Sequence, residues 1–351
     1  MNFLDGALFP YNQDKLVITA APYGPEWIPS DFPEDIAVTM DDQVQKAVDC
    51  YNAGATVLHV HVREADGKGS KRLSKFNELL TRLRIAVPDM VLQVGGSISF
   101  APESEGDAAK WLSDDTRHML AELTPKPDQV TVTVNTAQMN IFEQMDPADY
   151  AGTSLAEPAL FNAFREMIVP AGPTWAEEHV KRLSAKGIQS AFQFYNINSF
   201  ETVERMIRRG VYKGPLVMNW VAIGGGMDAP NIYNLANFLR AAPDGAMITL
   251  ESSMLNVLPI NMMAIAMGLH VRCGIEDNLW TQDRKSKMGT VKQIEQLVRI
   301  SREVGREVAN GKEAKNILKI DTFYNSIEET LAKNGFAPNR KTTSALQQAA
   351  E

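Results

Sequence analysis

The chain lacks most features that mark specialised classes of protein. Its 351 residues include only 2 cysteines, Cys50 and Cys273, which are too few for a disulfide framework, so a reducing cytoplasm is the expected location. Basic residues are outnumbered by acidic ones, 35 against 43, and the formal net charge is −8. Because a nucleic-acid partner needs a basic face, none is expected.

Long hydrophobic runs are also missing. The most apolar stretch, residues 257–271, is too short for a bilayer and contains Pro259, Asn261 and His270. Residues 1–9 contain Asp5 but no lysine or arginine, which is unlike a signal peptide. We therefore expect no association with a membrane.

What the sequence does contain is a regular alternation of short apolar runs with amphipathic segments of helical period. The apolar runs predict eight strands, at residues 16–21, 56–63, 90–94, 129–135, 188–195, 216–223, 246–250 and 270–275. Strands alternating with helices imply parallel βαβ units, and eight such units close a (β/α)8 TIM barrel, predicted here for residues 16–310. The alternative is an open doubly wound sheet, which is disfavoured because no glycine-rich dinucleotide motif follows the first strand.

Three segments lie outside this barrel pattern. Residues 1–15 form an arm before the first strand, and residues 311–351 predict a helical extension with a polar tail. An insertion at about residues 139–171 follows the fourth strand, and insertions there lie on the catalytic face of a barrel, where this one can cover the site. The last barrel helix opens at Thr290 with the Thr-x-x-Gln pattern of a capping box.

Two of only 5 histidines form the sequence His59-Val60-His61 on the second predicted strand. Residues i and i+2 of a strand share a face, and the opposite face is apolar, so both histidines point into the barrel. Two imidazoles at the end of one strand can bind one metal ion. The alternatives are a hydrogen-bonded pair of core histidines and an anion site.

A third ligand is available where the eighth predicted strand ends, in the pair Glu276-Asp277. Consecutive acids in such a position are costly unless they are exposed, paired or bound to a cation. In a closed barrel the second and eighth strands both neighbour the first, so Glu276 can complete a two-His, one-carboxylate set with His59 and His61. The alternative for the two acids is a helix N-cap exposed to water.

The other histidines are not expected to bind metal. His118 and His179 lie in charged helical segments and are expected on helix surfaces, whereas His270 is expected to be structural. Further polar or glycine residues gather at the predicted strand ends. They are Glu26 after the first strand, Gly96 and Ser97 after the third, and Thr131 and Thr133 on the fourth.

These segments together resemble the β-keto acid cleavage enzyme family, over residues 16–310 apart from the insertion. The matching segments are residues 18–21 with Glu26, residues 53–67 around His59-Val60-His61-Val62-Arg63, residues 224–227, and residues 270–278 with Arg272-Cys273-Gly274-Ile275-Glu276-Asp277-Asn278. The resemblance implies a zinc-dependent TIM-barrel acyltransferase. It would condense a β-keto acid with acetyl-CoA to give acetoacetate and a new CoA thioester, and it would be a homo-oligomer, a tetramer.

Carried over residue by residue, the resemblance also implies roles in the site. These are zinc ligands at His59, His61 and Glu276, a base dyad of Asp277 with Arg272, and a substrate-binding acid at Glu26.

Two positions depart from the family pattern, the turn after the third strand and Gln193, and one family residue has two candidates here. The Ser-Thr-Gly-Gly turn of the family is here Gly95-Gly96-Ser97-Ile98, so the serine that holds the substrate carboxylate is either Ser97 or absent. The family threonine is either Thr131 or Thr133, and Gln193 replaces a family glutamate. These departures leave the substrate open more than the reaction class.

Two other functions remain as alternatives at this point. One is a metal-dependent aldolase or hydrolase on the same barrel, although barrels of the amidohydrolase type need more histidines on their later strands. The other is a non-catalytic barrel that binds a small molecule. The presence of both metal-binding segments argues against it.

Overall fold

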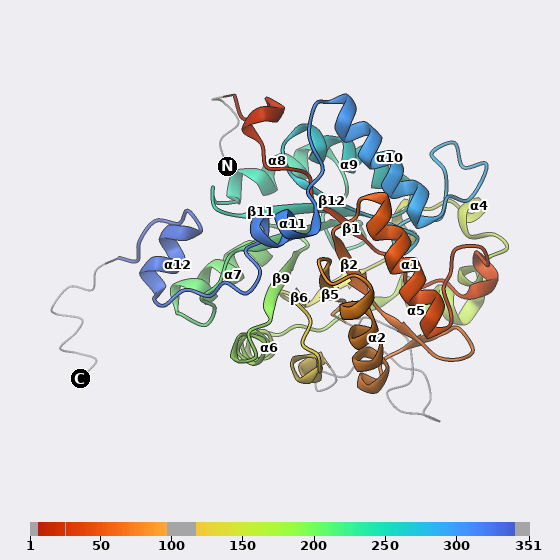
Figure 1. Cartoon of the computed structure of the whole chain (residues 1–351), viewed down its shortest axis with the longest axis horizontal. Coiled ribbons are helices and arrows are strands. Elements are labelled where there is room, and N and C mark those ends of the chain that lie inside the picture. Colours follow the sequence, from red (N-terminus) through yellow and green to blue (C-terminus); the bar gives the residue numbers. More distant parts are fainter. Residues whose placement is uncertain (1–5, 25, 97–116, 341–351) are drawn as a thin grey trace.

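Eight parallel strands close into a barrel in the computed structural model, which describes residues 6–24, 26–96 and 117–340 (Figure 1). Around the barrel the order is β1-β12-β11-β10-β9-β6-β5-β2. The strands are β1 (Ile18–Ala20), β2 (Val57–Val60), β5 (Val91–Val94), β6 (Gln129–Thr133), β9 (Gln189–Phe194), β10 (Val217–Ala222), β11 (Met247–Ser252) and β12 (His270–Cys273). Each corresponds to one of the eight predicted runs, although β11 extends two residues past the end of its run, and the TIM barrel is confirmed.

Helices pack around the outside of this ring. They are α1 (Met40–Ala53), α2 (Leu73–Ala86), α6 (Pro173–Ala185), α7 (Ile197–Arg208), α8 (Ile232–Ala241), α9 (Val257–Ala266) and α10 (Thr290–Glu303), and the short 3-10 turn η3 (Met119–Glu122) precedes β6. Within the described ranges, none of the helices is long and apolar enough to span a bilayer.

The two ends of the barrel interior differ in polarity. At the end where the strands begin, a floor of buried apolar side chains closes the barrel, with Val17, Val57, Val91, Ala191, Val217 and Met247. Helix α11 (Gly311–Ile317) adds Ala314 to this floor and lies across the centre of the ring in Figure 1. The second helix of the C-terminal stretch, α12 (Ile327–Lys333), lies to the side against α7. At the carboxyl ends of the strands, by contrast, polar side chains face one another inside the barrel.

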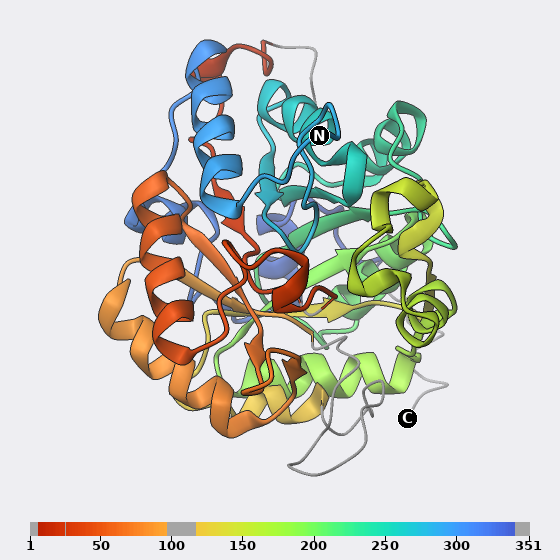
Figure 2. The same ribbon diagram turned by 90° about the vertical axis from the view of Figure 1, so that its right-hand side faces the viewer.

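The stretch after β6 builds a small structure of its own beside that polar end (Figure 2). Strand β7 (Ala137–Met139) pairs antiparallel with β8 (Met167–Val169), and η4 (Ile141–Gln144), α4 (Pro147–Tyr150), η5 (Ser154–Ala156) and α5 (Pro158–Arg165) lie between them. Met139 and Ile141 share an apolar cluster with Ile223 after β10 and Met254 after β11. These contacts fix the segment against the loops at the carboxyl ends of the barrel strands.

The prediction that His118 and His179 lie on helix surfaces is wrong. Their exposed fractions are only 8% and 1%, and both rings stack on Trp175 between α6 and η3. The charged neighbours that suggested exposure, such as Glu178, occupy other faces of the same helix. His270 is buried, and its Nδ1 accepts a hydrogen bond from the Val17 amide at 3.2 Å, which is a structural contact.

Candidate active site

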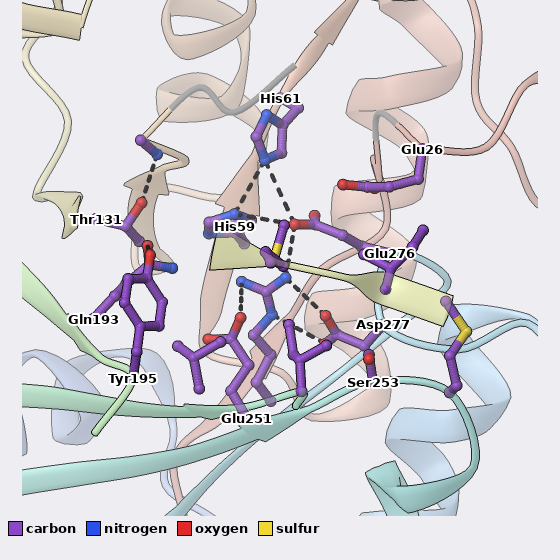
Figure 3. A pocket seen from close by; sticks show the side chains of 17 residues that line it. Glu26, His59, His61, Thr131, Gln193, Tyr195, Glu251, Ser253, Glu276 and Asp277 are labelled. Atoms are coloured by element: carbon purple, nitrogen blue, oxygen red, sulfur yellow. Dashed lines mark hydrogen bonds and ion pairs between the residues drawn. The ribbon is translucent and has the colours of Figure 1, made fainter. Parts of the chain in front are cut away.

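His59, His61 and Glu276 point toward one another at the polar end of the barrel (Figure 3). The two histidine Nε2 atoms lie 3.1 Å apart, and Glu276 Oε1 lies 3.4 Å from that of His59 and 3.6 Å from that of His61. All three side chains are buried or nearly so. One residue of β2, the residue that follows this strand and one that follows β12 thus converge over the end of β1, as the predicted adjacency of these strands requires.

Close backbone approaches make room for this group. A Cβ atom on Gly95, at the end of β5, would collide with the ring of His61. Gly274 has φ +143°, and a Cβ there would collide with the backbone of Ala21 after β1. The turn that follows β12 can therefore lie flat on β1, where the Glu276 amide donates to the Ala21 carbonyl at 3.1 Å. Only glycine at these two positions allows the three ligand atoms to meet.

The start of α10 supports the same turn. The Thr-x-x-Gln pattern predicted a capping box, but Gly289 is the N-cap residue, and the Thr290 amide donates to the carboxylate of the distant Asp35 at 2.9 Å. Instead Thr290 Oγ1 accepts from the Ile275 amide at 3.2 Å, and Gln293 Oε1 accepts from the Gly274 amide at 3.0 Å. The capping-box prediction is wrong because tertiary contacts with the turn use both side chains.

The three-residue group fits a divalent metal ion. Two nitrogens bound to one tetrahedral zinc at about 2.0–2.1 Å lie roughly 3.3 Å apart, close to the observed separation. Burial lowers the pKa of His59 to about 4, so its imidazole is neutral, as a metal ligand must be. Burial opposes ionisation of Glu276, but Arg272 holds its pKa well below the ordinary value. Glu276 Oε2 is buried without a hydrogen-bond partner in the protein. Two imidazoles and a carboxylate are the donor set of a catalytic metal site with open positions.

Arg272, on β12, connects the acidic side chains below this group. Its guanidinium donates to Asp277 through Nε at 3.0 Å and through Nη2 at 2.8 Å, and Nη2 also lies 2.7 Å from Glu276. Its Nη1 lies 3.3 Å from Glu251. Burial raises the pKa of Asp277 to about 6 even though Arg272 opposes the shift. Asp277 is therefore ionised at neutral pH but remains basic enough to take a proton.

Glu26 approaches the same group from the loop after β1 (Figure 3). Its Oε2 atom is buried without a hydrogen-bond partner. Burial, together with the negative charge of Glu276, raises the pKa of Glu26 well above its ordinary value. A carboxyl in this position gains from any cation or hydrogen-bond donor that enters the cavity.

Arg63 holds the loop that carries Glu26. It donates to the carbonyl oxygens of Trp27 at 2.8 Å, Gly67 at 2.7 Å and Gly24 at 2.5 Å. Two of these acceptors flank Glu26 in sequence. The arginine of the His-x-His-Val-Arg segment thus fixes the backbone on both sides of the acid.

A cavity opens above these residues. Its lining consists of Glu26, His59, His61, Gly96, Thr131, Met139, Ile141, Gln193, Tyr195, Val221, Ile223, Glu251, Ser253, Met254, Arg272, Glu276 and Asp277. One wall is apolar and comes from β10 and the segment after β6, while the others are polar. Ser97, which the sequence placed at this site, lies outside the described residues.

The two candidate threonines of β6 lie differently. Thr131 lines the cavity, and its hydroxyl accepts from the Gly96 amide at 2.5 Å. Thr133 makes hydrogen bonds with the hydroxyl of Tyr195 at 3.1 Å and with Gln193 at 3.4 Å, and both of these partners line the cavity. Thr131 is therefore the threonine that lies beside the turn after β5.

Sequence reasoning missed Glu251, Ser253 and Tyr195 in the cavity. Glu251 is 6% exposed, and burial raises its pKa to about 8. A signal for it was present, because Thr249 and Glu251 alternate with the apolar residues of β11 and so face inward. Its Oε2 atom and the Ser253 hydroxyl are buried without a hydrogen-bond partner.

Comparison with known proteins agrees with this geometry. The chain is 26% identical over 310 residues to the 3-keto-5-aminohexanoate cleavage enzyme of Acetoanaerobium sticklandii, covering 88% of this chain and 99% of that protein. It is 21% identical over 319 residues to the 3,5-dioxohexanoate:acetyl-CoA acetone transferase of Paraburkholderia graminis, covering 89% and 98%.

Among solved structures, ObcA in complex with oxaloacetate has the same fold. Its TM-score is 0.58 at 12% identity, over 81% of this chain and 67% of that one. Residues 15–320 match the β-keto acid cleavage enzyme family as a whole. The barrel, the converging histidines and glutamate, and this match lead to one conclusion: the chain is an enzyme of the β-keto acid cleavage enzyme family.

Proposed function

We propose that this enzyme is a zinc-dependent acyltransferase that condenses a β-keto acid with acetyl-CoA, releasing acetoacetate and a new acyl-CoA. The observation that carries the proposal is the group of His59, His61 and Glu276 beside the Arg272–Asp277 pair, all lining one cavity. Acetyl-CoA as the co-substrate is supported by the relatives, since the Paraburkholderia enzyme is a 3,5-dioxohexanoate:acetyl-CoA acetone transferase.

The zinc ligands in this proposal are His59, His61 and Glu276. Zinc held there would supply a Lewis acid that polarises substrate oxygens. Imidazole binds a metal as an uncharged ligand, so the two histidines would leave the ion most of its positive charge, and Glu276 would contribute the anionic ligand.

Asp277 acts as the general base. Its carboxylate takes a proton from the carbon between the keto and carboxyl groups of the substrate. This carbon then bonds to the acetyl carbonyl of acetyl-CoA, while the thioester C–S bond breaks and CoA leaves as its thiolate. Arg272 holds both carboxylate oxygens, which orients the base and keeps it ionised at neutral pH. The CoA thiolate then attacks the original keto carbonyl, the bond between that carbonyl and the same carbon breaks, and the carbon takes back the proton held by Asp277. The products are acetoacetate and the CoA thioester of the remaining acyl group.

Glu26 faces the distal end of the substrate in this proposal. In Figure 3 the side chain of Glu276 lies between Glu26 and Asp277, and the buried oxygen of Glu26 has no hydrogen-bond partner in the protein. Thr131 and Gly96 lie at the neighbouring rim. They contribute polar groups near the substrate carboxylate, together with Ser97 if the family serine is retained there.

A product assay tests the proposal. Purified enzyme is incubated with acetyl-CoA and a panel of β-keto acids that differ in chain length and distal charge, and the products are identified by mass spectrometry. Acetoacetate together with an acyl-CoA matching one panel member is expected. Cleavage of the keto acid without acetyl-CoA would instead indicate an aldolase or hydrolase, and binding without turnover would indicate a non-catalytic barrel.

The cytoplasmic location and the homo-oligomeric, tetrameric state implied by the family remain predictions. Light scattering of the purified protein at micromolar concentration would decide the second of these. A mass near four times that of the chain is expected.

A further inference from the structure

A row of three glutamines runs across the barrel interior beside His59. Gln93 on β5, Gln129 on β6 and Gln189 on β9 lie in register with His59 on β2, each paired with the next across adjacent strands. Their exposed fractions are 4%, 1% and 1%. Buried amides are costly unless their polar groups are paired, so a row of three requires an explanation.

Hydrogen bonds connect the row from end to end. His59 Nδ1 lies 2.8 Å from Gln93 Oε1, and Gln93 Nε2 donates to Gln129 Oε1 at 2.9 Å. Gln129 Nε2 donates to Gln189 Oε1 at 2.6 Å. Gln189 Nε2 then donates to the carbonyl oxygens of Leu318 and Lys319, at 2.9 and 3.2 Å.

The far end of the row fixes its direction. A backbone carbonyl can only accept a hydrogen bond, so the Gln189 amide must present its NH2 group there and its oxygen to Gln129. The same reasoning orients Gln129 and then Gln93. Gln93 must therefore offer its oxygen to His59, and an oxygen can be satisfied only by an N–H on Nδ1.

The two anchoring carbonyls are available because they lie just past the end of α11. The last carbonyls of a helix have no partner within it. Leu318 is buried in the apolar floor of the barrel, and Lys319 has φ +51°, so the chain turns sharply there. Gln189 donates to the Leu318 carbonyl and shares the Lys319 carbonyl with the Thr322 amide, which donates to it at 3.2 Å.

We infer that Gln93, Gln129 and Gln189 are positioning residues that transmit the polarity of the 318–319 carbonyls to His59. They hold its imidazole in the tautomer with the proton on Nδ1, which leaves the Nε2 lone pair facing His61 and Glu276. This inference rests on the proposed metal-binding function. It assigns a role in that function to a turn at the opposite end of the barrel, which makes no contact with the ligands.

Two variants test the inference at increasing distance from the site. Gln93→Leu removes the acceptor of His59, and loss of such a partner typically weakens metal binding about 10–100-fold. Gln189→Met breaks the row without touching His59 or Gln93. If both orientations of Gln93 then become equally populated, half of the molecules have the wrong tautomer and zinc affinity falls about twofold.

The measurements are zinc affinity, by competition with a chromophoric chelator, and the tautomer of His59 in metal-free protein, by two-bond ¹H–¹⁵N correlation spectra of histidine-labelled enzyme. A His59→Asn spectrum assigns the signal. We expect pure Nδ1–H in the wild type and mixed tautomers in Gln189→Met. Gln93→Glu should restore most of the zinc affinity lost in Gln93→Leu, because a carboxylate accepts from Nδ1 at least as well as an amide does.

Ser190→Ala is the matched control, because Ser190 is a buried polar neighbour of Gln189 on the same strand. It should leave both the tautomer and the affinity unchanged. A pure Nδ1–H signal in folded Gln189→Met, or a mixed one in the wild type, would overturn the inference. Absence of zinc binding in the wild type would overturn the proposed function instead, and the tautomer of the metal-free protein would still be measurable.

Discussion

Two pairs of buried histidines lie in this molecule, and they differ in what faces them. His59 and His61 have ring centroids 4.9 Å apart and Nε2 atoms 3.1 Å apart. His118 and His179 have centroids 5.4 Å apart and Nδ1 atoms 3.4 Å apart. The distances between the rings and the burial of the side chains are therefore similar in the two pairs. By distance alone, either pair could offer two nitrogens to one metal ion.

The charges around the pairs are opposite. Glu276 lies against the first pair, whereas the guanidinium of Arg117 stacks on Trp175, 3.7 Å from the ring centroid, beside the second. A cation gains from a carboxylate and is repelled by a guanidinium. Within the described part of the chain, His59, His61 and Glu276 form one group of three possible metal ligands. The second pair belongs instead to a stacked aromatic cluster with Trp175. The side chains facing the two pairs therefore distinguish them: a carboxylate completes a group of three possible ligands around the first pair, and a guanidinium lies beside the second.

The largest difference between the two pairs is expected in zinc content and turnover, when one histidine of each pair is replaced. His59→Ala should abolish binding of the single zinc ion and reduce turnover by on the order of 10³ or more, since Lewis-acid stabilisation is worth several kcal/mol. The matched variant His179→Phe should retain about one equivalent of zinc. Metal analysis of both purified proteins is the measurement. Full zinc occupancy in His59→Ala would disprove the ligand assignment.

A smaller effect is expected when the metal group is kept and the base is removed. Asp277→Asn preserves shape but cannot accept a proton, so zinc content should remain near normal while kcat falls about 10²–10⁴-fold. Steady-state kinetics and metal analysis on the same preparation measure both. Loss of zinc in this variant would make Asp277 a ligand rather than the base.

The pH profile of the wild type gives the corresponding control. Asp277 must be ionised to act, so activity should rise with pH through its pKa of about 6, and a bound cation can only move this limb lower. The limb should vanish from the residual activity of Asp277→Asn.

The next effect concerns the charge of the substrate. Glu26 has a buried oxygen without a partner, and a charge-assisted hydrogen bond to a distal ammonium would be worth roughly 1.5–3 kcal/mol. Glu26→Gln should therefore lower kcat/KM about ten- to hundredfold more for a cationic β-keto acid than for a neutral one of equal length. Equal losses on both substrates would show that Glu26 supports the metal group or orients water.

Sequence patterns predicted what depends on local periodicity. Strand alternation placed His59 and His61 on the inner face, and closure of eight strands brought Glu276 to them. The glutamine row could not be predicted, because it depends on the register between strands that lie 34 to 60 residues apart in the chain. The capping box predicted at Thr290 failed for a similar reason. The hydroxyl that would cap the helix accepts instead from the amide of Ile275, 15 residues earlier in the chain.

The second histidine pair shows the same limit. The charged neighbours of His179 predicted exposure, and only the packing of α6 against η3 reveals that the ring is buried. A side chain with alternative partners is fixed by tertiary context, which the sequence does not contain.

The smallest expected effect concerns that second pair and the stability of the fold. Burial, together with electrostatic repulsion from His118 and Arg117, lowers the pKa of His179 to about 3, against about 6.5 in an unfolded chain. Between these values the unfolded state binds more protons, so the contribution of His179 to stability falls as the pH drops from about 6.5 toward 3. At pH 5 this contribution should be about 2 kcal/mol lower than at neutral pH.

His179→Phe removes this titration while keeping an aromatic ring on Trp175. At pH 7.5 the variant should lose roughly 0.5–1.5 kcal/mol, because the hydrogen bond to His118 is gone. Between pH 7.5 and 5 its stability should fall less than that of the wild type. Urea unfolding of the metal-free proteins at both pH values measures the difference. If the two proteins lose equal stability on acidification, His179 is not held neutral by its surroundings, and the two histidine pairs differ in more than the charge that faces them.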